Sequence, residues 1–440
     1  MPNVADTARQ IADDVRAGRR TARAVVDEAL ARIAADDGRI GAFQLVDAEG
    51  ARRAADELDT RADKSGLALA GVPVAIKDNF DVAGFPTRHG SGATPETPAA
   101  TDDELVRRLR AAGAIVVGKT RLPELAIWGF TESLAQGGTR NPRNPDRNAG
   151  GSTGGGAAAV AAGMVPLALG SDGGGSLRIP SANCGVVGFK TARGLLPLPG
   201  GANEHWYGCS VTGPVGADLA DIVLATDVLS GNTDWRQAST VDGPLRVAVS
   251  LRSPSPIGPP GPGARAAVEA AAERAGAAGH RVTRSNPPYP LLLANMWVAC
   301  WHAGIAEEVE RAGLDVTLLE PRTQKMVAMG RRLRRRGKPT GADAEAWRRK
   351  ASAWFEKYDV MISPVIARPA RPFGHSARIG YWTGYLEGAR DTPYTQAWNL
   401  NGFPALSLPL GGTANEPGAV QLVAPPGREA AIIRLAEQLS

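Results

Sequence analysis

The sequence predicts an α/β protein with a large mixed, mostly parallel sheet that helices cover on both faces. The first observation behind this prediction is that short apolar runs alternate along the chain with stretches of helical periodicity. The second is the composition, since 43% of the 440 residues are hydrophobic and 22% are charged, as in a globular chain. The length allows up to about three domains, or one large α/β domain.

The first half of the chain supplies the start of this alternation. Residues 4–60 predict two or three helices, because apolar residues recur at spacings of four between alanines and charged residues. Residues 69–76 predict a short buried strand. The pattern then predicts a helix over 102–112, a strand over 114–117, a helix over 157–164 and a strand over 165–169.

The second half repeats the pattern after a loop of turn-forming residues. Residues 253–263 are rich in proline and glycine and predict a surface crossing that ends at a helix over 264–278. Strands are predicted over 360–363 and 405–408, and a closing helix over 428–439.

Charge and cysteine content argue against several classes of protein. The net charge is only +5, and the basic run Arg331–Arg336 predicts a solvated helix end rather than a nucleic-acid site. Cys184, Cys209 and Cys300 are odd in number and widely spaced, so neither a disulfide framework nor a zinc site is indicated. Without a visible signal peptide or membrane span, we expect a cytoplasmic protein.

Glycine is the most uneven feature of the sequence. Twelve of the 53 glycines fall between Gly150 and Gly188, around the hydroxyls of Ser152 and Ser176. A serine nucleophile needs a base and N–H donors that face the developing oxyanion. Backbone without side chains lets N–H groups converge in this way, as at 173–175. The alternative is that both runs are flexible loops.

Two other patterns compete with this interpretation. Gly113–Thr120 matches the phosphate-binding pattern G-x-x-x-x-G-K-[ST], which would indicate a nucleotide-binding protein. Its middle residues are alanine and β-branched residues, which favour a strand. Gly150–Gly154 matches G-x-S-x-G, but that turn follows a strand, and residues 141–148 predict a loop with two prolines.

The histidines do not indicate which residue is the general base, because none of the five has an informative context. A buried lysine can replace histidine, since desolvation lowers the pKa of an amine. Lys77 ends the apolar run 71–76 and is the candidate. A lysine that extends from a strand end to solvent is the ordinary alternative.

At these residues the sequence resembles the amidase signature family. The similarity covers nearly the whole chain and is carried by 71–79, 150–163, 169–190, 213–214, 359–364 and 399–409. It implies a single amidase domain over 1–440 with the amidase signature fold, a catalytic core segment over 60–215, and a variable substrate-pocket and C-terminal segment over 216–440.

The resemblance also implies a catalytic Ser-Ser-Lys triad. Ser176 would be the nucleophile, Lys77 the general base, and Ser152 the bridge that passes the proton between them. The family holds the bridging serine through a cis peptide bond, here between Gly151 and Ser152, with Thr153 beside it.

The oxyanion hole of the family falls on the backbone of Gly173, Gly174 and Gly175, together with that of the nucleophile. Asp172 and Arg178 match positions that brace this loop, and we expect them to form an ion pair. The chain departs from the family at three positions. Serine is common in the family where this chain has Thr153 and Gly156, and a larger residue is common in the place of Gly173.

The resemblance also implies a substrate pocket. The family's acyl pocket points to Trp128, Gly129 and Phe130, for which an ordinary core role is the alternative. A second aromatic set lies in the variable half and comprises Trp297, Trp301, Tyr381 and Trp382.

The resemblance implies an amidohydrolase that acts on a small-molecule carboxylic amide, with aryl esters or carbamates as further substrates. It implies no metal or organic cofactor, no nucleic-acid or membrane partner, and a monomer or homodimer. The alternative within the family is a tRNA-dependent amidotransferase A-type subunit. The alternative outside it is the nucleotide-binding protein.

Overall fold

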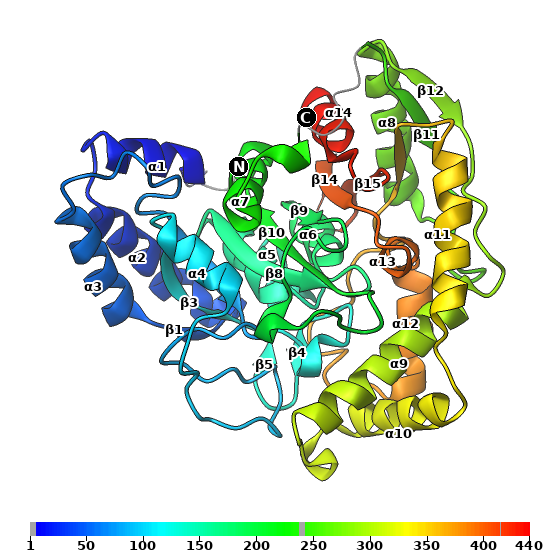
Figure 1. Ribbon diagram of the computed structural model, residues 1–440, viewed down its shortest axis with the longest axis horizontal. Helices are drawn as coiled ribbons and strands as arrows, with labels where there is room; N and C mark the ends of the chain where they lie inside the picture. Colours follow the sequence, from blue (N-terminus) through cyan, green and yellow to red (C-terminus); the bar gives the residue numbers. More distant parts are fainter. Residues whose placement is uncertain (1–5, 237–242, 414) are drawn as a thin grey trace.

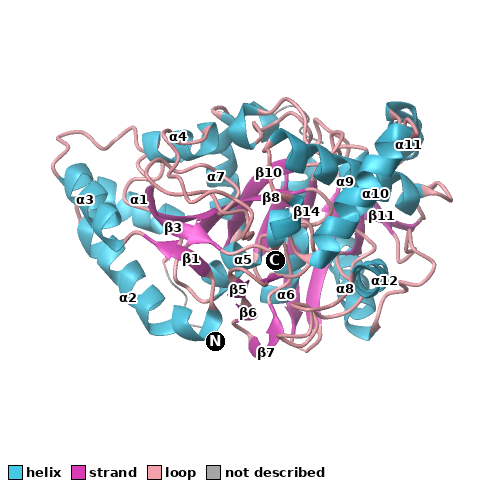
Figure 2. Ribbon diagram, turned by 90° about the horizontal axis from the view of Figure 1, so that it is seen from below, coloured by secondary structure: helices cyan, strands magenta, loops and turns pink. Residues whose placement is uncertain are grey.

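One large sheet organises the computed structural model, which describes residues 6–236, 243–413 and 415–440 (Figure 1). Helices lie on both sides of this eleven-stranded sheet (Figure 2). Its strands follow the order β1 (Phe43–Val46), β3 (Ile115–Thr120), β2 (Pro73–Lys77), β8 (Leu167–Asp172), β10 (Val211–Gly216), β9 (Val187–Lys190), β14 (Ala405–Gly412), β15 (Pro417–Val423), β13 (Val360–Pro364), β11 (Arg246–Val249) and β12 (Arg281–Arg284).

The prediction of a large mixed sheet is confirmed, but the expectation that parallel pairs predominate is wrong. Parallel pairing joins β2 to β3 and β8, and β11 to β12 and β13. Antiparallel pairing joins the other neighbours, from β8 through β10, β9, β14 and β15 to β13, and β1 to β3. The sequence predicted β2, β3, β8, β13 and β14 and missed the other six strands of the sheet, among them β15, which pairs with β14 after a short connection.

The helices predicted over 4–60, 102–112, 157–164, 264–278 and 428–439 are present, with further helices between them. Thr7 begins the first helix with a capping box, in which Gln10 N donates to its hydroxyl. The helices are α1 (Ala8–Arg16), α2 (Ala22–Ile40), α3 (Ala48–Asp59), α4 (Glu104–Ala111), α5 (Gly154–Ala161), α6 (Arg178–Cys184), α7 (Leu219–Ser230), α8 (Pro262–Ala277), α9 (Leu293–Arg311), α10 (Pro321–Arg335), α11 (Gly341–Phe355), α12 (Tyr381–Asp391), α13 (Gln396–Leu400) and α14 (Glu429–Leu439).

One local prediction is corrected. Residues 141–148, expected as a loop, take part in a hairpin of β6 (Arg140–Asn141) and β7 (Asn144–Asn148), outside the main sheet. A second small pair joins β4 (Glu132–Ser133) to β5 (Gly137–Gly138). Both pairs are short, so the alternation of apolar and polar residues that marks longer strands is absent.

The predicted glycine-rich segment is close-packed rather than flexible. A side chain added at Gly155 would lie 2.4 Å from the carbonyl oxygen of Ala42, and one at Gly154 would clash with the hydroxyl of Thr131. The glycines therefore let α5 approach neighbouring backbone closely. Across the described ranges, every helix is too short or too polar to cross a membrane.

Candidate active site

The ends of two parallel strands bring the first site residues together. Strands β2 and β8 pair in parallel with Ile76 opposite Leu169, so the residues that follow lie at the same edge of the sheet. Lys77 ends β2, and Ser171 lies one residue before the end of β8. This edge, beyond the carboxyl ends of parallel strands, is where α/β proteins usually place ligand sites.

Lys77 is fully buried and faces two hydroxyl groups. Its Nζ lies 2.8 Å from Ser152 Oγ and 2.9 Å from Ser171 Oγ. Burial lowers the pKa of the amine from 10.5 to about 7, against the opposing charge of Asp172. A large fraction of the amine is therefore neutral at neutral pH and able to accept a proton.

Ser152 stands on the predicted cis peptide bond. The bond between Gly151 and Ser152 is cis, as expected from the resemblance. A side chain at Gly151 would lie 2.4 Å from the carbonyl oxygen of Phe130, so this position requires glycine. Thr153 follows, and its hydroxyl donates to Ser171 O at 3.1 Å.

Ser176 is 9% exposed and lies beside Ser152 and Thr153. Its carbonyl oxygen accepts a hydrogen bond from Thr153 N at 3.1 Å. Among the hydrogen bonds of the described residues, none joins the hydroxyls of Ser152 and Ser176. Both side chains line one cavity.

The glycine loop before Ser176 is oriented by its neighbours. Trp297 Nε1 donates to Gly173 O at 2.9 Å, and Thr395 Oγ1 donates to Gly174 O at 2.6 Å. These two hydrogen bonds hold the carbonyl groups of the loop. In the described part of the chain, the N–H groups of Gly173, Gly174 and Ser176 donate no hydrogen bond.

Gly175 differs from the expectation for this loop. Its N–H donates to Asp172 Oδ1 at 2.6 Å, so it is not free to bind an oxyanion. A φ of +124° at Gly175 explains why this position is glycine, since side chains disfavour that region. The candidate donors are therefore Gly173, Gly174 and Ser176.

The predicted ion pair between Asp172 and Arg178 is confirmed. Arg178 Nη2 lies 2.9 Å from Asp172 Oδ1, its Nε lies 2.9 Å from Oδ2, and both side chains are fully buried. Burial opposes ionisation of Asp172, but the charge and hydrogen bonds of Arg178 outweigh it and hold the pKa of the carboxyl far below its usual value. Asn399 and Gln421 complete the shell by accepting from Arg178 at 2.6 and 2.5 Å.

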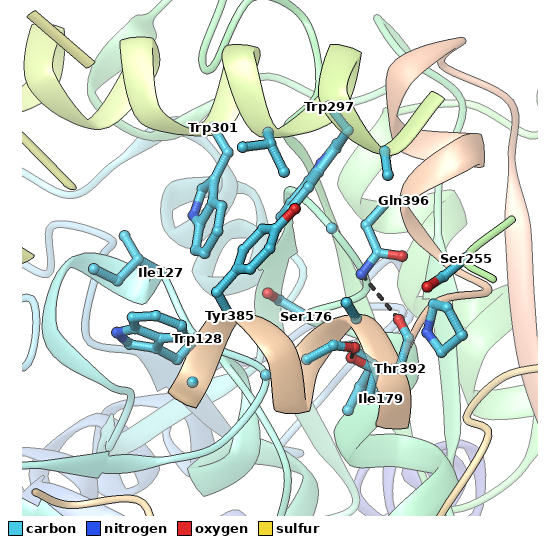
Figure 3. Close-up of a pocket in the computed structure, with 18 of the residues that line it drawn as sticks. Ile127, Trp128, Ser176, Ile179, Ser255, Trp297, Trp301, Tyr385, Thr392 and Gln396 are labelled. Carbon is cyan, nitrogen blue, oxygen red and sulfur yellow. Dashed lines mark hydrogen bonds between the residues drawn. The ribbon is translucent and has the colours of Figure 1, made fainter. Parts of the chain in front are cut away.

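An aromatic cavity opens beside Ser176. Figure 3 shows Trp297 and Trp301 extending into it from α9, with Tyr385 from α12 facing them. Ser255, Thr392 and Gln396 lie at the end away from Trp128 (Figure 3).

The predicted pocket residues divide between this cavity and the packing behind it. Trp128 and Gly129 line the aromatic cavity, whereas Phe130 does not. Phe130 instead stacks on Trp128 with ring centroids 5.6 Å apart. Of the second aromatic set, Trp297 and Trp301 line the cavity. Tyr381 packs against Trp128 with centroids 6.4 Å apart, and Trp382 is 54% exposed.

A polar cavity also opens beside Ser176. Ser152, Ser171 and Gly173 line it, together with carboxylates and histidines. Only Ala126, Ser176 and Trp206 belong to the linings of both cavities. Its other polar members, which the sequence did not indicate, are Asn79, Asp81, Thr87, His89, Thr94, Asp103, His205, Ser210, Glu308 and Arg311.

The phosphate-binding pattern does not form a site. In Gly113–Thr120, residues 115–120 are the buried strand β3, which confirms the strand interpretation. Lys119 lies 2.8 Å from Asp78 in a buried ion pair and is not available to a phosphate. Within the described ranges, no group of three or more His, Cys, Asp or Glu side chains could hold a metal ion.

The sequence matches the amidase family over residues 24–433. The chain is 39% identical to "Putative amidase AmiB2" of Mycobacterium tuberculosis, an alignment that covers 98% of this chain and 94% of the relative. The structure of 6-aminohexanoate cyclic dimer hydrolase superposes with a TM-score of 0.87 at 29% identity, covering 99% of this chain and 96% of that one. The chain therefore belongs to the amidase signature family and is an enzyme that hydrolyses amide C–N bonds.

Proposed function

We propose that the protein cleaves a carboxylic amide through an acyl-enzyme on Ser176, with Lys77 as the general base and Ser152 as the proton bridge. The observation that carries this proposal is the Lys77 amine, which is fully buried, has a pKa of about 7, and lies 2.8 Å from Ser152 Oγ. A neutral amine held against a hydroxyl is what activation of a serine requires.

In the first half-reaction, Ser176 Oγ forms a bond to the substrate carbonyl carbon. Its proton passes to Ser152 Oγ as the Ser152 proton passes to Lys77 Nζ. The oxygen that becomes negative faces the N–H groups of Gly173, Gly174 and Ser176, which stabilise it. The C–N bond then breaks, and the proton returns from Lys77 through Ser152 to the leaving nitrogen.

In the second half-reaction, water attacks the ester on Ser176. Lys77 removes the water proton through the same bridge, and the carboxylic acid leaves as Ser176 recovers its hydroxyl. The position of Ser152 also determines the orientation in which the substrate binds. Since Ser152 lines the polar cavity and not the aromatic one, the leaving amine lies in the polar cavity and the acyl group in the aromatic cavity.

The aromatic cavity favours an aryl or arylalkyl acyl group. Trp297, Trp301 and Tyr385 offer ring faces and edges, and aromatic pairs add about 1 kcal/mol each beyond area burial. Aryl esters and carbamates present the same carbonyl to the same donors, and we propose them as secondary substrates.

The test is a panel of arylalkanoyl amides, esters and carbamates on the purified chain and its variants. Ser176→Ala and Lys77→Ala should lower kcat by about 10⁴-fold or more, and Ser152→Ala by less. Mass spectrometry should detect the acyl group on Ser176 when a slowly hydrolysed carbamate is used. Ser181→Ala, which removes a buried hydroxyl bonded only to Leu177 O, is the matched control. Full activity of Ser176→Ala would refute the proposal.

A further inference from the structure

Trp206 fills a slot between two glycines beside the catalytic serine. A side chain at Gly173 would lie 2.6 Å from the Trp206 carbons Cε3 and Cζ3, and one at Gly304 would lie 2.6 Å from its Cδ1. Gly173 belongs to the loop before Ser176, and Gly304 to α9. The indole is 5% exposed, so these contacts are close-packed.

The slot is built by one face of α9. Trp297, Trp301, Gly304 and Glu308 follow one another at spacings of four, three and four, which places them on the same side of the helix. Trp297 packs against the glycine loop, since a side chain at Gly174 would clash with its ring. The loop therefore lies between two indoles, with Trp206 at Gly173 and Trp297 at Gly174.

Several interactions hold the Trp206 ring in place. Its Nε1 donates to Glu308 Oε2 at 3.4 Å, and its ring stacks on His205 with centroids 5.2 Å apart. His205 lies 3.1 Å from the same carboxylate. Trp206 has a φ of +49°, a region that residues other than glycine disfavour. The surrounding contacts therefore hold the residue in a backbone conformation that it would not adopt on its own.

We propose that Trp206 positions the oxyanion loop and separates the acyl cavity from the leaving-group cavity, in the place that a side chain at position 173 would occupy. The inference rests on the proposed function, because that function makes Gly173 an oxyanion donor. It accounts for the glycine at a position where the family commonly has a larger residue. It also makes Trp206 a specificity-determining residue, because the ring bounds the space next to the leaving nitrogen.

The experiment combines a substitution at Gly173 with a substitution at each of the two tryptophans. Gly173→Thr should clash with the indole, misplace the donor, and lower kcat about 100-fold with little change in KM. Adding Trp206→Ala should restore kcat at least about tenfold, as directly coupled contacts do. Adding Trp297→Ala instead should restore nothing, because Trp297 does not occupy the space of a side chain at position 173, and its loss also removes the hydrogen bond to Gly173 O. If Trp297→Ala restores Gly173→Thr equally, or Trp206→Ala restores nothing, the proposal is overturned.

A second measurement tests the separating role. With one acyl group and amines of increasing bulk, Trp206→Ala should raise the ratio of kcat/KM for the bulky amine over the small one by about tenfold. Trp206→Phe, which keeps a ring, should leave this ratio near that of the wild type. An unchanged ratio in Trp206→Ala would overturn the separating role.

Folding and the proposed function are controlled separately. Circular dichroism and thermal unfolding report whether each variant folds, and Gly173→Ala replaces Gly173→Thr if the larger side chain prevents folding, since its Cβ alone meets the indole. Activity that survives Ser176→Ala would refute the acyl-enzyme mechanism without any reference to Trp206. The pattern of restoration refutes or supports the role of Trp206 alone.

Discussion

Replacing the buried Lys77 by methionine should abolish activity and stabilise the protein below pH 7. The amine has a pKa of about 7 in the folded protein against 10.5 as its ordinary value. Between these values the unfolded chain binds the proton and the folded protein releases it, so stability rises with pH through this window. Methionine has a similar volume and no proton to lose.

The size of the effect follows from these two pKa values. Keeping the lysine costs the folded state about 4.5 kcal/mol at pH 6.5 and about 2.5 kcal/mol at pH 8.5. Methionine loses the hydrogen bonds to Ser152 and Ser171, at about 1 kcal/mol each. Lys77→Met should therefore be more stable than the wild type by about 2.5 kcal/mol at pH 6.5 and by about 0.5 kcal/mol at pH 8.5.

Urea unfolding of both proteins at the two pH values measures this difference. Other groups titrate equally in both proteins and cancel, so the change of about 2 kcal/mol reports Lys77 alone. Lys357→Met removes an exposed amine and is the control, with the same difference from wild type at both pH values. A pH-independent difference for Lys77→Met would refute a lowered lysine pKa.

Further predictions concern activity and the surrounding shell. The kcat/KM of the wild type should rise through an apparent pKa near 7 and level off above it, because only neutral Lys77 accepts a proton; a profile flat into acid would contradict this. Arg178→Met should lower the free energy of unfolding by about 3 kcal/mol or more, because it leaves Asp172 buried without its partner; urea unfolding measures it. Trp128→Ala should raise KM for an aryl amide more than Phe130→Ala, since only Trp128 lines the cavity; equal effects would argue against this cavity as the acyl site. Activity of the purified chain without partner subunits would argue against an amidotransferase A-type role.

The sequence predicted the core of this fold and site because its signals were local. Lys77 follows a continuous apolar run, and Ser152 and Ser176 sit within glycine clusters, so each was visible within a few residues. The cis bond at Gly151 and the ion pair of Asp172 came from the resemblance, and the structure contains both.

The parts that the sequence did not predict depend on distant contacts. Nothing near Trp206 shows that its ring lies against Gly173, because Gly304 and Glu308 come about a hundred residues later. The hydrogen bond from Gly175 to Asp172 likewise depends on backbone conformation. Phe130, predicted to line the acyl pocket, packs against Trp128 outside the aromatic cavity. The sequence could not predict this, because nothing near two aromatic residues so close in the chain shows which one faces the cavity.

The residues that hold Arg178 determine when the site can form during synthesis of the chain. The proposed nucleophile and base have been synthesised by residue 176, but Arg178 is held by Asn399 and Gln421, more than two hundred residues later. Asn399 also donates to the carbonyl oxygen of Asp172, directly before the glycine loop. A nascent chain therefore carries Lys77, Ser152 and Ser176 long before the proposed oxyanion loop can be fixed. Hydrolysis should begin only after the last strands have left the ribosome.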